Sequence, residues 1–135
     1  MSLAGVFHLP AFIRAGTGSV RWFWNRRVGS VETNDVILRA WSPVLYPWVF
    51  KSPVLIAHGT SDSRVPRVQS DVLVTALRSS GKSVLYLVMP GFAHEWDDHQ
   101  NQQRFLALTE FFLAQTLGGA VEPPAPHEEW KAFLR

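Results

Sequence analysis

Two apolar runs that each lead into a polar loop constrain this chain most strongly. The first lies in the stretch Pro53–Pro66, Pro-Val-Leu-Ile-Ala-His-Gly-Thr-Ser-Asp-Ser-Arg-Val-Pro, and delivers Asp62 just after it ends. The second covers Val84–Val88, is stopped by a Pro-Gly pair and is followed by His94. Neither run alternates with polar residues, which is typical of parallel strands covered on both faces. The chain is therefore expected to build a buried parallel sheet.

Helical patterns separate and follow the two runs. Val68–Ser79 places its apolar residues on one stripe with Gly81 behind it, and Gln100–Leu117 repeats apolar residues at helical spacing. Strand, helix, strand, helix predicts an α/β fold with three layers, αβα. The less regular first part predicts a strand over Leu3–Phe7, irregular chain over Pro10–Gly18, helices over Ser19–Arg27 and Asp35–Trp41, and a loop over Pro43–Lys51.

The composition fits one globular domain without a strongly charged partner. The 135 residues are 47% hydrophobic and 18% charged, and the net charge is +2. The tightest basic group, Arg21, Arg26 and Arg27, is interpreted as a solvated helix face, so no nucleic acid is expected. The chain has no cysteine, which excludes disulfides and thiolate chemistry and fits a cytoplasmic location.

No membrane or targeting segment is predicted. The first ten residues lack the positive and apolar regions of a signal peptide. The most hydrophobic span, Ala40–Ala57, contains Lys51 and three prolines, which a membrane helix tolerates poorly.

Asp62 and His94 are expected to meet at one edge of the sheet. Asp62 lies five residues after Ala57, and His94 lies six after Val88. Parallel neighbours end side by side, at the edge where ligands bind in open α/β sheets. A carboxylate there can accept the Nδ1 hydrogen of an imidazole and stabilise the imidazolium. Taken alone, Asp62 could be a turn residue bonding its own backbone and His94 a solvated loop side chain.

The motifs around these residues resemble a known family. His58-Gly59-x-x-Asp62-x-Arg64-Val65-Pro66, then Pro90-Gly91-x-x-His94 and a closing Phe-Leu…Leu-Gly-Gly, are similar to the C-terminal part of the prolyl oligopeptidase family, in its acylaminoacyl-peptidase and dipeptidyl-peptidase branch. The resemblance covers Ser42–Gly119 well and Ala4–Arg39 loosely. It implies the parallel-sheet half of an α/β-hydrolase domain, incomplete at the N-terminal side.

By this resemblance Asp62 is the acid of a Ser-Asp-His triad and His94 its general base, while Val65-Pro66 helps to fix the Asp loop. The implied reaction is hydrolysis of a peptide or acyl-amino bond in the complete enzyme. The implied partner is a peptide or acyl-peptide substrate, and no cofactor is implied. The alternative is a non-catalytic remnant or interaction module with the same fold.

The nucleophile that the family uses is missing. No serine stands in Gly-x-Ser-x-Gly: Ser19 has Thr17 and Arg21 at the two glycine positions, and Ser61 has Gly59 before it but Ser63 after it. In the family this elbow lies upstream of the part that aligns with Leu3–Phe7, so the chain is expected to begin just after it. The free chain is then expected to be a poor peptidase or none, with an open sheet edge through which it could form a homo-oligomer.

Three further groups of residues allow more than one interpretation. A metal site from His94, Glu95, Asp97, Asp98 and His99 is less favoured than a solvated loop, so no metal is expected. The aromatic residues before the first confident strand form a pocket wall, or ordinary core, or core that a truncation exposes; these are Trp22, Trp24, Trp41, Trp48 and Phe50. His8, His58 and His127 are interpreted as structural or solvated.

Two segments are predicted, residues 1–119 as the hydrolase portion and residues 120–135 as a Pro-rich linker with a short tail.

Overall fold

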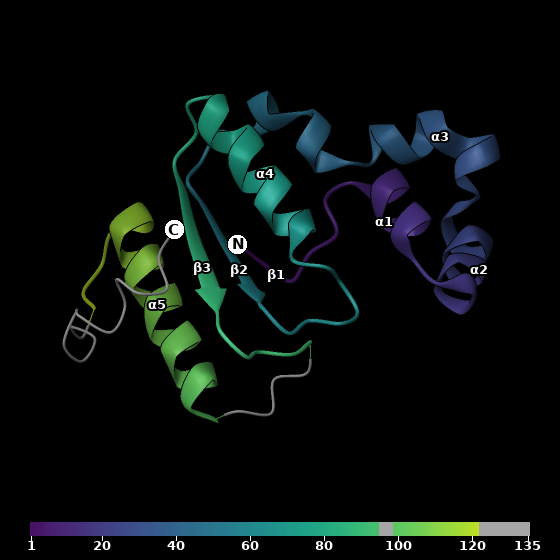
Figure 1. Ribbon diagram of the computed structural model, residues 1–135. Coiled ribbons are helices and arrows are strands. Elements are labelled where there is room, and N and C mark those ends of the chain that lie inside the picture. The colour runs from purple at the N-terminus through teal and green to yellow at the C-terminus, as the bar shows by residue number, and fades with distance from the viewer. Residues whose placement is uncertain (95–98, 122–135) are drawn as a thin grey trace.

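The computed structural model of the protein describes residues 1–94 and 99–121. Its elements in chain order are β1 (Ser2–Leu3), α1 (Leu9–Ala15), α2 (Gly18–Val28), α3 (Val31–Ala40), the short 3₁₀ helices η1 (Pro43–Leu45) and η2 (Pro47–Val49), β2 (Val54–Gly59), α4 (Val68–Ser79), β3 (Val84–Met89) and α5 (His99–Leu117) (Figure 1). None of the described helices is long and apolar enough to cross a bilayer.

The sheet is parallel and has the order β1-β2-β3. β2 and β3 pair along their whole lengths, from Val54 opposite Val84 to Gly59 opposite Met89. β1 contributes only two pairs to the other side of β2, where Leu3 lies opposite Ala57. The prediction that the two apolar runs are neighbouring parallel strands is confirmed.

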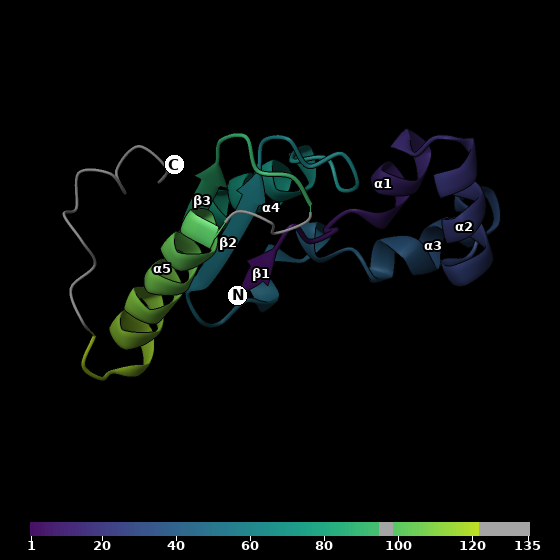
Figure 2. The ribbon, with the colours of Figure 1, turned by 90° about the horizontal axis from the view of Figure 1, so that it is seen from below.

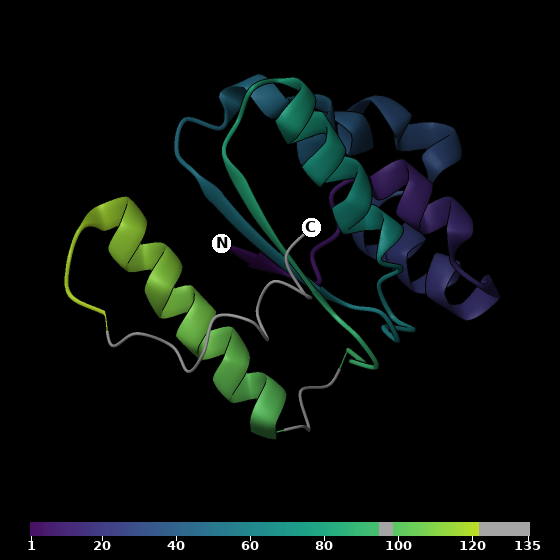
Figure 3. The ribbon, with the colours of Figure 1, turned by 60° about the vertical axis from the view of Figure 1, so that its left-hand side comes forward.

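Residues alternate along β2 between two hydrophobic clusters, as the period of a strand requires. Leu55 and Ala57 face the cluster that contains the buried side of α5, whereas Ile56 faces the cluster that contains α4. The view in Figure 3 shows α4 and α5 on opposite faces of the sheet. The predicted three-layer αβα arrangement is therefore confirmed.

The helices α1, α2 and α3 form a separate unit beside the sheet, as Figure 2 shows. A third apolar cluster joins α1 to α3 and includes Val65 from the loop after β2. None of the residues of α2 is buried. Trp24 packs edge-on against Phe12, but Trp22, Trp41 and Trp48 are each about 60% exposed. Most of the aromatic group is thus surface rather than core.

Two predictions for the N-terminal part are wrong. The strand expected over Leu3–Phe7 is Ser2–Leu3, because the backbone at Ala4 turns into the left-handed region (φ 46°) and leaves the extended conformation. The segment expected to be irregular contains α1. Pro10 occupies its first turn, where a proline needs no hydrogen-bond partner, and the His8 ring Nδ1 accepts a hydrogen bond from the Ala11 amide (3.1 Å).

The start of α3 also differs from the prediction. It begins at Val31 rather than Asp35, because the Ser30 hydroxyl accepts a hydrogen bond from the Thr33 amide (3.3 Å) and caps the helix there. Asn34, three residues after Val31, interrupts the helical dihedral angles (φ −123°). The segment predicted as a loop, Pro43–Lys51, contains the short helices η1 and η2. The remaining strands and α-helices lie within one or two residues of their predicted positions.

We expect Leu55→Ala to lower the free energy of unfolding by about 2–5 kcal/mol, since Leu55 is fully buried between the sheet and α5. The matched control, Leu106→Ala on the exposed side of α5, should change it by less than about 0.5 kcal/mol. Urea unfolding followed by circular dichroism measures both. Equal losses would mean that α5 does not cover this face of the sheet.

Candidate functional site

The loops after β2 and β3 leave the same edge of the sheet, because Gly59 and Met89 are register partners at the ends of the two strands. Asp62 lies three residues beyond Gly59, and His94 lies five beyond Met89. The ends of parallel strands are the usual place for a site in open α/β sheets. The fold thus brings both predicted site residues to one edge.

Direct hydrogen bonds fasten the two loops to each other. The Thr60 amide donates to the Met89 carbonyl (3.0 Å), and the Ser61 amide donates to the Phe92 carbonyl (2.9 Å). In return, the Gly91 amide donates to the Thr60 hydroxyl oxygen (2.8 Å). Asp62 and His94 therefore lie on two loops that are hydrogen-bonded to each other.

Gly59 makes this close approach possible. A Cβ atom on Gly59 would lie 2.2 Å from the backbone carbonyl oxygen of Phe92, a distance that no side chain can occupy. The contact is with backbone, so a rotamer change cannot relieve it. A glycine is required here because the backbone of the loop after β3 lies so close, and not because of the dihedral angles of Gly59.

The two oxygens of the Asp62 carboxylate perform different tasks. Oδ1 accepts hydrogen bonds from the amides of Arg64 (2.9 Å) and Val65 (2.8 Å), which closes the loop on itself. Oδ2 accepts a hydrogen bond from Nδ1 of His94 (2.8 Å). The side chain is only 1% exposed. The turn interpretation of Asp62 and the pairing interpretation are thus both fulfilled, by different atoms.

The surroundings of Asp62 favour its ionised form. Burial alone would raise the pKa of the Asp62 carboxyl, but the hydrogen bonds from the Val65 amide, the His94 ring and the Arg64 amide outweigh it, and they hold this pKa below its ordinary value. A buried carboxylate that accepts several hydrogen bonds is a fixed negative charge next to His94.

His94 presents one ring nitrogen to Asp62 and keeps the other available. Because the carboxylate can only accept, Nδ1 carries the hydrogen in this bond and Nε2 of the neutral ring has a free lone pair. Nε2 has no hydrogen-bond partner among residues 1–94 and 99–121, and the side chain is 32% exposed. This is the tautomer and the accessibility that a general base needs.

Sequence reasoning missed the involvement of His58. Its ring is fully buried beneath the Asp loop, and both ring nitrogens lie within hydrogen-bonding distance of a partner. The signal was the strand period, since His58 must share a face with Ile56 and point toward α4.

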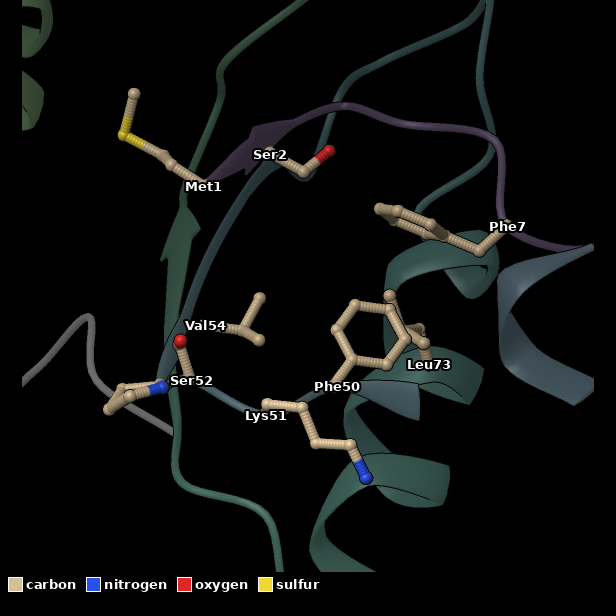
Figure 4. Close-up of a pocket in the computed structure, with 9 residues that line it drawn as sticks. Met1, Ser2, Phe7, Phe50, Lys51, Ser52, Val54 and Leu73 are labelled. Atoms are coloured by element: carbon tan, nitrogen blue, oxygen red, sulfur yellow. The ribbon is translucent and has the colours of Figure 1, made fainter. Parts of the chain in front are cut away.

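A cavity of about 310 Å³ lies elsewhere, near the first residues of β2. Figure 4 shows Phe7, Phe50, Val54 and Leu73 converging on it, with Lys51 at the side. Val54 begins the strand that ends at Gly59, so the cavity is at the opposite end of β2 from Asp62. It is not a pocket for the Asp–His pair. Of the aromatic residues expected in a pocket wall, Phe50 contributes to this cavity.

Most of the considered metal cluster lies outside the described residues, namely Glu95, Asp97 and Asp98. Nε2 of His99 lies 3.1 Å from the side-chain amide nitrogen of Gln103, one helical turn later. Within the described part of the chain, no group of three or more potential ligands is arranged to hold a metal ion.

We expect Gly59→Ala to lower the free energy of unfolding by at least about 1–3 kcal/mol, because the new methyl group forces the two loops apart. Gly18→Ala is the matched control. An added Cβ at Gly18 meets nothing within 4 Å, so the change there should stay below about 0.5 kcal/mol. Urea unfolding distinguishes the two, and an unperturbed Gly59 variant would contradict the close approach.

The ionised Asp62 should also make stability depend on pH. Its folded-state pKa is lowered, so its contribution is present above the unfolded value of about 3.9 and is lost as the pH falls through the lower folded value. We expect the difference in unfolding free energy between the wild type and Asp62→Asn to be largest near neutral pH and to shrink in acid. Urea unfolding between about pH 6 and pH 3 measures it. A difference that stays constant with pH would contradict this assignment.

Comparisons with known proteins agree with the fold and identify a family. Residues 2–120 match the model of the prolyl oligopeptidase family. The chain is 39% identical to dipeptidyl aminopeptidase BIII of Pseudoxanthomonas mexicana over 82 residues, which are 61% of this chain and 12% of the relative. It is 34% identical to dipeptidyl peptidase family member 6 of Caenorhabditis elegans over 97 residues, 72% of this chain and 13% of the relative.

Among solved structures, a puromycin-hydrolyzing peptidase of Mycobacterium tuberculosis superimposes with a TM-score of 0.82 at 26% identity. The match covers 92% of this chain and 19% of that one, so the chain spans only a small part of the proteins it resembles. The three parallel strands and the helices that cover them match part of an α/β-hydrolase domain. The family match extends over nearly the whole chain, and the chain belongs to the prolyl oligopeptidase family of serine peptidases.

Proposed function

We propose that this chain supplies the acid and the base of a Ser-Asp-His triad for hydrolysis of peptide or acyl-amino bonds. The observation that supports the proposal is the 2.8 Å hydrogen bond from His94 Nδ1 to the buried Asp62 Oδ2, with Nε2 left available. In this assignment His94 is the general base, and Asp62 orients it and stabilises its charged form.

The reaction is acyl transfer to a serine hydroxyl. His94 Nε2 takes the hydroxyl proton as the serine oxygen bonds to the substrate carbonyl carbon. The C–N bond then breaks, and the same proton passes from Nε2 to the leaving amine. Water releases the acyl group by the same sequence, with His94 again taking and returning a proton. Nδ1–H stays bonded to Asp62 throughout.

None of the serines of this chain stands in Gly-x-Ser-x-Gly. The proposal therefore requires a nucleophilic serine that is not part of this sequence. A well-placed base contributes about 10²–10⁴-fold to the rate, and a single oxyanion-hole donor about 10²–10³-fold. The pair alone therefore gives little peptidase activity. Residues 1–119 are proposed to be the hydrolase portion and residues 120–135 a linker and tail.

The names of the two relatives favour peptides from which dipeptides are released as the substrate class. Both share the region of this chain's family match, and neither name mentions an acyl-amino substrate. A peptide substrate would meet the edge of the sheet from which Asp62 and His94 emerge.

A second candidate function is a non-catalytic interaction module. The observation that favours it is the exposure of three tryptophans, Trp22, Trp41 and Trp48, on the helical unit and the loop that follows it. Exposed tryptophans are enriched where proteins bind one another. The two candidates differ in whether His94 is needed for a chemical step.

The test is a chimera in which residues 2–120 replace the homologous stretch of the Pseudoxanthomonas mexicana enzyme, assayed with a chromogenic dipeptidyl substrate. We expect the chimera to be active and His94→Gln to lower its kcat by at least about 10²–10⁴-fold, the contribution of a general base. Asp62→Asn should act in the same direction, because it removes the acceptor that fixes the His94 tautomer.

His99→Gln is the matched control, since His99 is an exposed histidine whose hydrogen-bond partner among the described residues is Gln103; it should leave kcat unchanged. A fluorophosphonate probe should label the chimera but not the free chain, and labelling of the free chain would reveal a nucleophile that the motifs do not indicate. A folded chimera whose activity is indifferent to His94→Gln would favour the interaction module.

A further inference from the structure

His58 is a buried histidine in the middle of an apolar layer. It is the fifth residue of β2 and has no exposed surface. Because side chains alternate along a strand, it lies on the same face as Ile56 and points toward α4. A polar ring in this position is costly unless its nitrogens are satisfied, so their partners identify what the ring does.

Both ring nitrogens of His58 are hydrogen-bonded. Nε2 lies 2.8 Å from the carbonyl oxygen of Val65, and Nδ1 lies 2.7 Å from the hydroxyl of Ser70. A carbonyl can only accept, so Nε2 carries a hydrogen in every protonation state of the ring. His58 therefore always donates to Val65, while Ser70 adapts by donating or accepting.

Val65 connects His58 to Asp62. The Val65 carbonyl is held by His58, and the amide of the same residue donates to Asp62 Oδ1 (2.8 Å). Pro66 follows Val65, so the peptide group that carries this carbonyl has no N–H of its own. His58 thus holds one end of the residue whose other end fixes the Asp62 carboxylate.

His58 also touches the carboxylate itself. Its Nε2 lies 3.5 Å from Asp62 Oδ2, the oxygen that accepts the hydrogen bond from His94. Asp62 is therefore flanked by two imidazole rings, one fully buried on the α4 side and one partly exposed on the open side. The buried ring therefore occupies the space next to Oδ2 on the α4 side.

Ser70, His58 and Asp62 also form a serine-histidine-aspartate chain by their contacts, but this chain is not a second catalytic site. Ser70 and His58 have no exposed surface at all, so no substrate carbonyl can reach the Ser70 hydroxyl. These three residues therefore contact only other parts of the protein and not a substrate.

We propose that His58 is a positioning residue for the Asp62–His94 pair, acting through the Val65 carbonyl and the buried side of the carboxylate. This proposal rests on the proposed function, because an exact orientation of Oδ2 matters only if the Asp62–His94 pair is catalytic. Its geometric content is independent of activity and is tested on the free chain.

The test compares His58→Gln with His58→Asn. The glutamine amide reaches the place of Nε2 and can still donate to the Val65 carbonyl, whereas the shorter asparagine reaches only the place of Nδ1 and can bond Ser70. Both variants replace the ring by an amide in the same buried position. The measurement is the His94 Nδ1–H signal in the proton NMR spectrum, its ¹⁵N tautomer signature and its rate of exchange with water.

We expect His58→Gln to retain this signal and His58→Asn to exchange the His94 Nδ1 proton about tenfold faster, the factor for losing one supporting hydrogen bond. Ser70→Ala should retain the signal, because it leaves the Val65 bond in place. Ser42→Ala controls for general destabilisation. Ser42 is equally buried, but its hydroxyl bonds Leu38 and Leu9 instead of the Asp loop.

The outcomes separate the two proposals. If the wild-type chain lacks the His94 signal, the pair itself is not formed and the proposed function loses its support along with this inference. If the wild type shows the signal and His58→Asn keeps it unchanged, only the positioning role of His58 is overturned. Equal loss of the signal in Ser42→Ala and His58→Asn would likewise reduce His58 to a structural residue.

Discussion

The site depends on the contact between the loops that follow β2 and β3. These loops touch backbone to backbone at Gly59 and Phe92, with hydrogen bonds in both directions between them. Full pairing of the two strands brings the loops to the same edge, and the absent Cβ lets them close. The separation of Asp62 and His94 is therefore fixed by main-chain geometry before either side chain contributes.

Within that frame, Asp62 serves the fold and the pair at the same time. Its Oδ1 accepts the hydrogen bonds that two loop amides would otherwise donate to water, and its Oδ2 accepts the hydrogen bond from His94. The same bonds keep the carboxylate charged despite its burial, by lowering its pKa. Asp62 therefore both stabilises its loop and polarises the imidazole of His94. A substitution of Asp62 affects both at once.

The elements that sequence reasoning located well are those fixed by local pattern. α4 lies where its apolar stripe and Gly81 predicted it, and β2 and β3 lie where buried runs end at glycine or Pro-Gly. The edge shared by Asp62 and His94 follows from parallel pairing alone. The starts of α1 and α3 were harder to predict, because they are set by side-chain caps and a proline position, such as His8 with Pro10, which leave little trace in hydrophobic periodicity.

His58 could not be assigned from the sequence for a related reason. Its period within β2 gives the direction of the ring, but not the identity of the carbonyl it meets, which belongs to a loop residue seven positions later. The aromatic residues show the converse difficulty. Trp22 and Trp24 stand two residues apart on α2, yet one is exposed and the other packs against Phe12, and only the placement of α1 decides between them.

The two members of the pair carry different weight as signs of function. Asp62 is explained by the loop it closes, so its presence alone is compatible with a fold that does no chemistry. His94 has no such structural duty among the described residues: it is partly exposed, its one bond is to Asp62, and its Nε2 is unengaged. The stability of the fold does not require an imidazole held in one tautomer at the exposed edge of the sheet. A proton-transfer step does need one, and for that reason the catalytic interpretation rests on His94 more than on the buried carboxylate that holds it.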